Sequence, residues 1–328
     1  MKKALVGLVA LLALSEPADA LPVPVAIATG PYIAEGVAAS AEGRPLVSGV
    51  LARTVRLIAR QGPLDWLRPG RFAPLGDLFG MAADRKRDRL WIAETFGAGL
   101  PGQSGPDRTG LLEVELGSGR VLGRHTAPPE AARRTIGDVT LAADGSVYAS
   151  DSTGGALYRL RPGHRDLELF ARTGLKSPQG MVVSGRGAAL IVADYASGLH
   201  WVDLTTGAHT PLDGEGARLR GIDGLVRDGS SLIATQNGGT PNRILRLHLS
   251  ADERTVESVE MLVQGPEGLD DLSLGAVIGR RFVFVAHSQW GAVGAGGALS
   301  PNPGTALLSS VDLGPPGQQA APRNGRKP

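Results

Sequence analysis

The stretch "IDGLVRDGSSLIATQ", residues 222–236, holds two short apolar runs on either side of an Asp-Gly-Ser-Ser turn. Asp223 stands at the start of the first run, and Gln236 ends the second. Two such runs joined by turn residues are typical of a β-hairpin. On its own, an Asp-Gly pair would be interpreted as turn chemistry, because both residues favour turns. The interpretation of Asp223 therefore depends on whether the plan recurs in the chain.

The plan recurs in five other segments. Each has a polar or small pair, about four apolar residues, a turn and a second apolar run. The segments are "AEGVAAS" from 34, "LFGMAAD" from 78, "IGDVTLA" from 136, "PQGMVVS" from 178 and "LDDLSLG" from 269. The second runs end at Gly49, Glu94, Asp151, Asp194, Gln236 and His287. The spacing between segments is 42 to 58 residues, the period of a propeller blade with three or four strands.

Six units predict an all-β fold, a six-bladed β-propeller. A two-sheet sandwich would not repeat its turn chemistry six times, and a β-helix would have a shorter period. The longest interval contains the loop "FGAGLPGQSGPDRTG", which fits one blade with a long insertion. Closing the ring needs a strand from the N-terminal end, and "PVPVAIATG", residues 22–30, is the candidate.

The ends of the chain are expected to lie outside the propeller. Residues 1–20 combine Lys2 and Lys3, a short apolar run and a final "ADA", which predicts a bacterial signal peptide and a periplasmic or secreted protein. The propeller is then a single domain over 21–313, followed by a disordered basic tail rich in Pro and Gly over 314–328. No later stretch is long and apolar enough for a membrane-spanning helix.

Composition excludes several kinds of chemistry. The chain has no cysteine, which excludes disulfides, thiol nucleophiles and cysteine-bound zinc. The net charge is +2, and the tail alone carries three positive charges, so the body is close to neutral. This balance gives no indication of nucleic-acid binding. The expected partner is a small-molecule substrate or ligand; the sequence leaves the oligomeric state open.

Propeller geometry predicts where polar residues gather. The innermost strand of each blade starts at one mouth of the central channel, and the second strand returns to the same face. The second positions of the six segments, residues 35, 79, 137, 179, 223 and 270, should therefore form a ring with the ends of the second strands. Many oxygen donors without cysteine favour a hard cation such as Ca²⁺.

With these segments in view, residues 30–313 resemble the senescence marker protein and gluconolactonase family of six-bladed propellers. The segments "SPQGMVVSGRGAALIVADY" and "IDGLVRDGSSLIATQNGG" carry the resemblance best. The resemblance implies a divalent metal, most simply Ca²⁺, held by a Glu in the first repeat, an Asn in the fourth and an Asp in the fifth. These positions correspond to Glu35, Gln179 and Asp223. This chain departs from the family in having Gln179 for Asn, and Gly137-Asp138 where Asn-Asp is common.

The resemblance also implies an activity, the metal-dependent opening of a lactone or related ester by an exported hydrolase. Asp138 or His287 is the expected general base. Glu94, Asp194, Gln236, Asn237 and Trp290 are expected to contact substrate or to orient the ligands. Two alternatives stay open: His287 and Asp194 could be purely structural, and the ring could be a non-catalytic scaffold for a small ligand or a cell-envelope partner.

Overall fold

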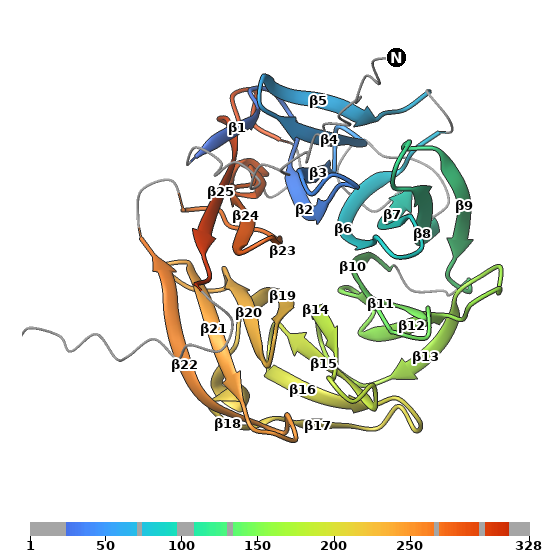
Figure 1. The fold of residues 1–328 in the computed structure, drawn as a ribbon, viewed down its shortest axis with the longest axis vertical. Helices are drawn as coiled ribbons and strands as arrows, with labels where there is room; N and C mark the ends of the chain where they lie inside the picture. The colour runs from blue at the N-terminus through green and yellow to red at the C-terminus, as the bar shows by residue number, and fades with distance from the viewer. Residues whose placement is uncertain are drawn as a thin grey trace, which may run out of the picture.

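The computed structural model describes residues 24–70, 74–96, 108–129, 134–265, 269–294 and 299–314. It is a six-bladed β-propeller, in which six sheets radiate from a central axis (Figure 1). The predicted signal peptide, most of the long loop in the second blade and all but Gly314 of the predicted tail lie outside the described residues. Among the described residues, no helix has the length and apolar character needed to cross a membrane.

Each blade is built on four antiparallel strands that step outwards in chain order, except that the outermost strand of the sixth blade is β1. The innermost strands are β2 (Ala34–Ala39), β6 (Asp77–Asp84), β10 (Ile136–Leu141), β14 (Pro178–Val183), β19 (Ile222–Asp228) and β23 (Gly275–Ile278). The second strands are β3 (Pro45–Gly49), β7 (Arg89–Phe96), β11 (Val147–Asp151), β15 (Ala189–Asp194), β20 (Ser231–Gln236) and β24 (Arg281–His287).

The outer part of each blade is built from two further strands. The third strands are β4 (Thr54–Ala59), β8 (Arg108–Glu115), β12 (Ala156–Leu160), β16 (Gly198–Asp203), β21 (Arg243–Leu249) and β25 (Ala306–Asp312). The fourth strands, counted outwards from the axis, are β5 (Gly62–Leu67), β9 (Val121–Thr126), β13 (Glu168–Arg172), β17 (His209–Pro211), β22 (Thr255–Gln264) and β1 (Val25–Ala28). The short β18 (Asp213–Gly214) pairs in parallel with β22, and two 3₁₀ turns, η1 (Glu215–Arg218) and η2 (Trp290–Ala292), complete the elements.

The N-terminal strand closes the ring. Strand β1 pairs antiparallel with β25, so the sixth blade takes its outermost strand from the start of the chain. This confirms the closing strand expected within residues 22–30. Ile27 is fully buried in a cluster with Val285 and Leu308 of the sixth blade and with Val47 of the first. The closure therefore joins the first and last blades through apolar packing as well as through backbone hydrogen bonds.

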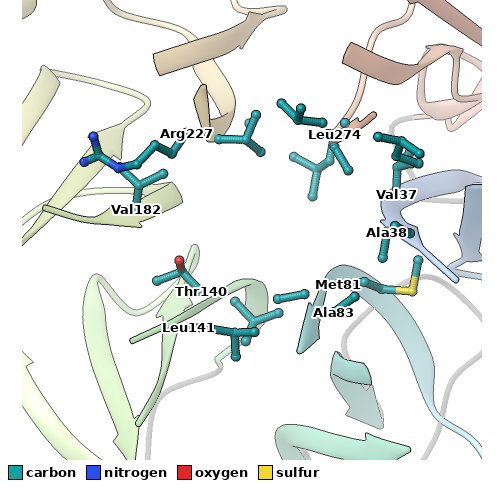
Figure 2. A pocket seen from close by; sticks show the side chains of 18 of the residues that line it. Val37, Ala38, Met81, Ala83, Thr140, Leu141, Val182, Arg227 and Leu274 are labelled. Carbon is teal, nitrogen blue, oxygen red and sulfur yellow. The ribbon is translucent and has the colours of Figure 1, made fainter. Parts of the chain in front are cut away.

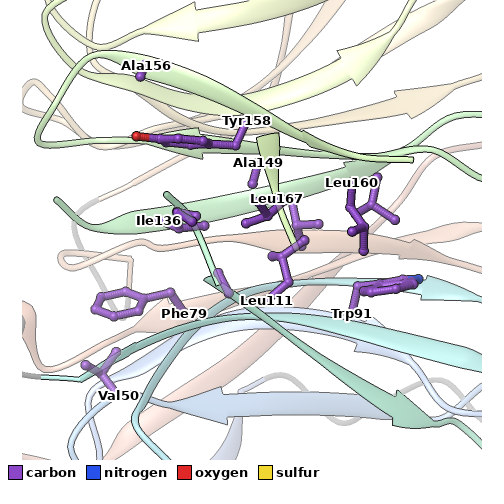
Figure 3. Packing of buried hydrophobic residues seen from close by; sticks show 14 of the residues in the cluster. Val50, Phe79, Trp91, Leu111, Ile136, Ala149, Ala156, Tyr158, Leu160 and Leu167 are labelled. Atoms are coloured by element: carbon purple, nitrogen blue, oxygen red, sulfur yellow. The ribbon is translucent and has the colours of Figure 1, made fainter. Parts of the chain in front are cut away.

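The hydrophobic core is divided into separate clusters, which lie between neighbouring blades. One cluster fills the space between the second and third blades, where Phe79, Trp91 and Leu111 face Ile136 and Tyr158 (Figure 3). Similar clusters lie between other neighbouring blades. Because the apolar side chains pack between adjacent sheets, the axis itself is left open as a channel.

The start of each inner strand is irregular, and this irregularity shapes the channel mouth. In the first five blades the pairing register shifts at the segment's polar pair, for example between Ile222 and Gly224. Glycine after the polar residue lets neighbouring strands approach closely. A Cβ atom on Gly180 would lie 2.4 Å from the backbone nitrogen of Leu225, and one on Gly36 would lie 2.5 Å from the carbonyl oxygen of Phe79. The bulges thus bring the polar side chains of different blades together.

The sixth blade departs from the register that the sequence suggested. Its inner strand begins only at Gly275, and Asp271 meets His287 in an isolated bridge. Ser273 and Leu274 are the residues that lie beside Glu35 of the first blade, through a side-chain and a backbone hydrogen bond. Asp270, expected in the ring, lies on the rim instead. The apparent match of "LDDLSLG" to the other segments is therefore shifted by three residues at this position.

Candidate functional site

Three of the predicted residues meet at one mouth of the channel. Glu35, Gln179 and Asp223 line a cavity of about 370 Å³. The other lining residues come from four blades and the loop after β24: Phe79, Thr135, Gly137, Ser152, Tyr195, Asn237 and Trp290. We call this space the ring cavity. The inner strands β2, β14 and β19 place the three predicted ligands, because each residue stands next to the glycine of its bulge.

Glu35 is held tightly at the wall of the ring cavity. Its Oε2 accepts hydrogen bonds from Ser273 Oγ at 2.8 Å and from Trp290 Nε1 at 2.5 Å. Burial, and next the negative charge of Asp223, raise the pKa of the Glu35 carboxyl to about 8, although the two donated hydrogen bonds oppose the rise. The residue is 8% exposed. Glu35 is thus an oriented carboxyl whose ionisation is costly in the absence of a positive charge.

Asp223 is fixed from the neighbouring strand. Asn237, immediately after β20, donates from Nδ2 to Asp223 Oδ2 at 2.8 Å and to the Leu272 carbonyl at 2.9 Å. The hydroxyl of Tyr195 donates to Asn237 Oδ1 at 3.0 Å, which fixes the amide. Burial raises the pKa of Asp223 to about 6, and the Asn237 hydrogen bond opposes this rise. The carboxylate is therefore the most readily ionised of the acidic groups around the ring cavity.

Gln179 is held at the ring cavity by hydrogen bonds that begin at Asp194, the last residue of β15. Asp194 accepts from the backbone of Ser177, and Ser177 accepts from Gln179. Its Nε2 donates to Ser177 Oγ at 2.9 Å, which orients the amide and turns Oε1 towards Gly137. A Cβ atom on Gly137 would lie 3.7 Å from that oxygen and 3.3 Å from Ser152 Oγ. The two departures from the family pattern are therefore adjacent in space, and the missing side chain at position 137 leaves room beside the longer amide.

Asp138 occupies the place that glycine takes in four other blades. It pairs with Ser150 as Gly224 pairs with Thr235, and a Cβ atom on Gly80 would lie 2.3 Å from its Oδ1. Burial raises the pKa of Asp138 to about 8; Asp223 adds to the rise, while a hydrogen bond from Val139 N opposes it. Asp138 lines the channel just below the ring cavity and not the ring cavity itself.

The donor set fits a hard cation. The negative charge of Asp223 raises the pKa of both Glu35 and Asp138, that of Asp138 adds to the rise at Glu35, and no Lys or Arg is among the described residues that line the ring cavity. Oxygen donors from two carboxylates and an amide, completed by water, are what Ca²⁺ takes. Within the described residues, no group of three or more His, Cys, Asp or Glu side chains forms a cluster that could hold a metal, so Gln179 and water are needed to complete the set.

His287 lies outside the ring cavity. Its Nδ1 is 3.0 Å from Asp270 Oδ1 on the outer rim, and Gly304 approaches its Nε2. Asp270 is among the residues that line a second, polar cavity of about 570 Å³, which shares Tyr195, Asn237 and Trp290 with the ring cavity. The pair His287 and Asp270 is therefore placed at the entrance and not against the predicted ligands.

The polar residues that end four of the second strands form hydrogen bonds within their own blades. Each bonds to the backbone just before the inner strand. Oxygens of Glu94, Asp151 and Asp194 accept the backbone N–H that precedes the inner strand, from Gly76 at 2.9 Å, Thr135 at 3.0 Å and Ser177 at 2.7 Å. Gln236 donates to the Arg220 carbonyl at the same point of the fifth blade. None of the four side chains lines the ring cavity.

Two of these residues nevertheless differ in their link to the site. The Glu94 carboxylate is paired with Arg124 at 2.5 Å, away from the ring cavity. Asp194 holds the backbone of Ser177, whose hydroxyl receives Gln179, so it supports the site indirectly. Asn237 and Trp290, both predicted, line the ring cavity directly.

Ser152, Tyr195 and Ser273 are site residues that were not predicted from the sequence. Ser152 and Tyr195 each follow a second strand by one residue, the position that Asn237 occupies in the fifth blade. The signal was therefore present one residue beyond the strand ends. Ser273 could not be found in this way, because the register of the sixth blade differs from that of the others.

Comparison with solved structures supports the fold. A PQQ-bound aldose sugar dehydrogenase from Streptomyces coelicolor superposes with a TM-score of 0.59 at 15% identity, covering 87% of this chain and 96% of that protein. A candidate gluconolactonase gives 0.55 at 18% identity, covering 90% and 95%. A luciferin-regenerating enzyme gives 0.58 at 12% identity, covering 89% and 95%. No protein-family model matches the sequence, and a search of curated proteins finds no match. The resemblance suggested by the sequence is thus confirmed at the level of the fold.

Proposed function

We propose that the protein is a metal-dependent hydrolase that opens a lactone or related ester in the ring cavity. The observation that carries the proposal is the convergence of Glu35, Asp223 and Gln179 on one small cavity without a positive side chain. A divalent cation, most simply Ca²⁺, would be held by these three residues and water. When bound, it would polarise a carbonyl oxygen and position water.

Other residues near the ring cavity would orient the ligands or transfer a proton. Ser273 and Trp290 fix one oxygen of Glu35, and Asn237 fixes one oxygen of Asp223, so the ligands are oriented before any cation arrives. We assign Asp138 as the general base, because it lies just below the ring cavity, close enough to Asp223 for the two charges to interact, and its pKa near 8 would let it accept a proton from attacking water and return it to the leaving oxygen. His287, the other predicted base, is paired with Asp270 at the rim.

The test measures cation binding and hydrolysis together. Ca²⁺ is expected to raise the melting temperature, a chelator to lower it, and Asp223→Ala to abolish the difference, because binding to the folded state stabilises that state. Asp270→Ala, which removes a rim carboxylate, is the matched control and should keep the calcium response. A panel of lactones and esters with and without Ca²⁺ then tests the chemistry. No calcium response in the native protein would overturn the proposal.

A second candidate is a non-catalytic site for a small ligand. It is favoured by the hydrogen bonds that already occupy Oε2 of Glu35, and by Gln179 and Gly137 where the family has asparagine. A flat lactone and ester panel, combined with stabilisation by a small ligand, would select this candidate. Hydrolysis that depends on Ca²⁺ and is lost in Asp138→Asn would select the enzyme.

Export is proposed from the leader alone. Residues 1–20 have the charge, apolar run and "ADA" ending of a secretory signal. The intact mass of protein recovered from the periplasm or the medium should correspond to a chain that starts at Leu21. An uncleaved mass from the cytoplasm would contradict this expectation.

A further inference from the structure

The central channel contains a second space on the face opposite the ring cavity. It has a volume of about 630 Å³, and all six inner strands line it from their later residues. Figure 2 shows side chains of several blades arranged around an open centre, with Val37, Met81, Leu141 and Leu274 among them. We call this space the lower channel. It shares no lining residue with the ring cavity, so it is a separate site.

Aliphatic side chains form one part of the wall of the lower channel, and Asp138, Thr140 and the charged residues of the open end form the rest. Val37, Met81, Val139, Met181 and Leu225 line it and are otherwise buried. Smaller or partly exposed apolar residues continue the wall towards the open end: Ala39, Ala83, Leu141, Val183 and Val277. Along this aliphatic part of the wall, ordered water would find few of the polar partners it needs. This part of the wall suits an apolar chain.

The inner end of the lower channel is acidic. Asp138 lies there beside Gly80, so close that a Cβ atom on Gly80 would lie 2.3 Å from Asp138 Oδ1. Glu35 and Asp223 are just beyond and interact electrostatically with Asp138. An anionic group at this end would be repelled, so a bound molecule with a negative head should point that head towards the open end.

The open end carries two cations and one carboxylate, Glu42, whose Oε2 accepts a hydrogen bond from Ser40 Oγ at 3.0 Å. Arg227 is engaged by both oxygens of Glu253, at 2.7 and 3.2 Å, and its guanidinium points away from the open centre in Figure 2. Arg85, exposed in the turn after β6, donates only to the backbone carbonyl of Ala41 and forms no ion pair with any described residue. Its guanidinium therefore remains available to an acidic ligand.

From these observations we propose that the lower channel binds a linear aliphatic carboxylate of medium length. The chain lies along the aliphatic wall with its methyl end below Asp138, and the carboxylate meets Arg85 at the open end. The proposal does not rest on the reaction proposed for the ring cavity, although Asp138, the base assigned to that reaction, lies at the inner end of the lower channel. Each methylene placed in the channel is expected to raise affinity about fourfold until the space is filled.

The experiment is a calorimetric titration of the native protein with hexanoate, octanoate, decanoate and dodecanoate, and with decanol as the neutral comparison. Affinity should rise with chain length to a plateau, and decanoate should bind about five- to tenfold more tightly than decanol. Arg85→Ala should remove the preference for the carboxylate but keep the binding of decanol. Lys86→Ala, which removes the neighbouring exposed cation, is the matched control and should change neither.

A second variant tests the chain site. Ala83→Phe places a ring in the lower channel and should reduce decanoate affinity at least tenfold, whereas Ala188→Phe in an exposed turn should not. Should Ala83→Phe fail to fold, Ala39→Leu tests the same wall from the first blade. Affinity that does not depend on chain length, or that survives these channel substitutions, would overturn the proposal. Equal binding of decanoate and decanol would overturn the role of Arg85.

Discussion

Asn237 holds Asp223 from the adjacent strand, with its Nδ2 2.8 Å from Oδ2 of the carboxylate. The amide is itself fixed by the hydroxyl of Tyr195. Asn237→Ala is therefore expected to leave Asp223 free to rotate and to weaken calcium affinity about 10- to 100-fold, the usual effect of losing a group that orients a metal ligand. A calcium titration followed by melting temperature or calorimetry measures the change.

The control for this substitution is Asn242→Ala. Asn242 lines the second, polar cavity of about 570 Å³ beside the ring cavity and donates to the Leu269 carbonyl, but it makes no hydrogen bond to Asp223. Its loss should leave calcium affinity within about twofold of the native value. Equal losses in the two variants would show that the rim as a whole, and not the bond to Asp223, supports the site.

Trp290 should set the pH at which Glu35 can act as a ligand. Its indole N–H and the Ser273 hydroxyl both lower the pKa of Glu35, so removing either donor raises that pKa above its present value of about 8. Trp290→Phe and Ser273→Ala should each move the midpoint of calcium binding to higher pH and weaken binding severalfold at pH 7. Calorimetry between pH 6 and pH 9 measures the midpoint. A midpoint that does not move in either variant would contradict this role.

The acidic residues at the channel mouth should also make the metal-free protein less stable as pH rises. The folded-state pKa is about 8 for Glu35 and Asp138 and about 6 for Asp223, above their ordinary values of 4.5 and 3.8. Between about pH 4.5 and pH 8 the folded state thus binds more protons than the unfolded state, and the free energy of unfolding falls as pH increases.

Denaturant unfolding in the presence of a chelator measures this slope. Asp138→Asn should make the decline between pH 5 and pH 8 shallower, because one of the raised carboxyls is gone. Saturating Ca²⁺ should also reduce the decline, since it binds the ionised carboxylates. Native and Asp138→Asn curves that run parallel across this interval would show that Asp138 ionises as easily in the folded protein as in the unfolded chain.

The sequence predicted the six blades and the closing strand because each unit must satisfy the same local requirements. Every blade needs turn residues between short apolar strands, and a repeated period makes that visible. Glu35, Gln179 and Asp223 could be found for the same reason, since each precedes the glycine that lets neighbouring inner strands approach. At these three residues, the glycine that the close approach of the strands requires also marks the same position in each repeat.

The remaining site residues depend on details that a repeat does not encode. The bulges decide which residue at a strand end faces the cavity. The wall is formed one residue after the second strands end, by Ser152, Tyr195 and Asn237, and of these only Asn237 was predicted. In the sixth blade two aspartates resemble the pattern, but the inner strand starts later and Ser273 lies beside Glu35. Register at a bulge is set by contact between blades, which spacing in the sequence cannot show.

Glu94 is expected to matter for stability and not for the site. Its carboxylate is 2% exposed and is paired with Arg124 through Nε at 2.5 Å and Nη2 at 3.1 Å. Arg124→Ala would leave a buried carboxylate without its cation, which should lower the free energy of unfolding by about 3–5 kcal/mol. Urea denaturation measures this loss.

The matched control is Arg120→Ala, which breaks the exposed pair with Glu115 and should change stability little. Calcium affinity measured below the unfolding transition should be unchanged in Arg124→Ala, because Glu94 does not line the ring cavity. A weakened calcium site in that variant would instead support the substrate or ligand role that the sequence suggested for Glu94.

Ile27 should be the residue through which the closing strand stabilises the ring. It is fully buried between the first and last blades, and its carbonyl accepts a hydrogen bond from Arg56 Nη1 at 2.6 Å. Ile27→Ala removes buried apolar volume from the junction and should lower the free energy of unfolding by about 2–5 kcal/mol in urea denaturation. Val25→Ala in the same strand, at a partly buried position, should cost clearly less. Equal losses would mean that the strand contributes through its backbone pairing with β25 and not through the packing of Ile27 between the two blades.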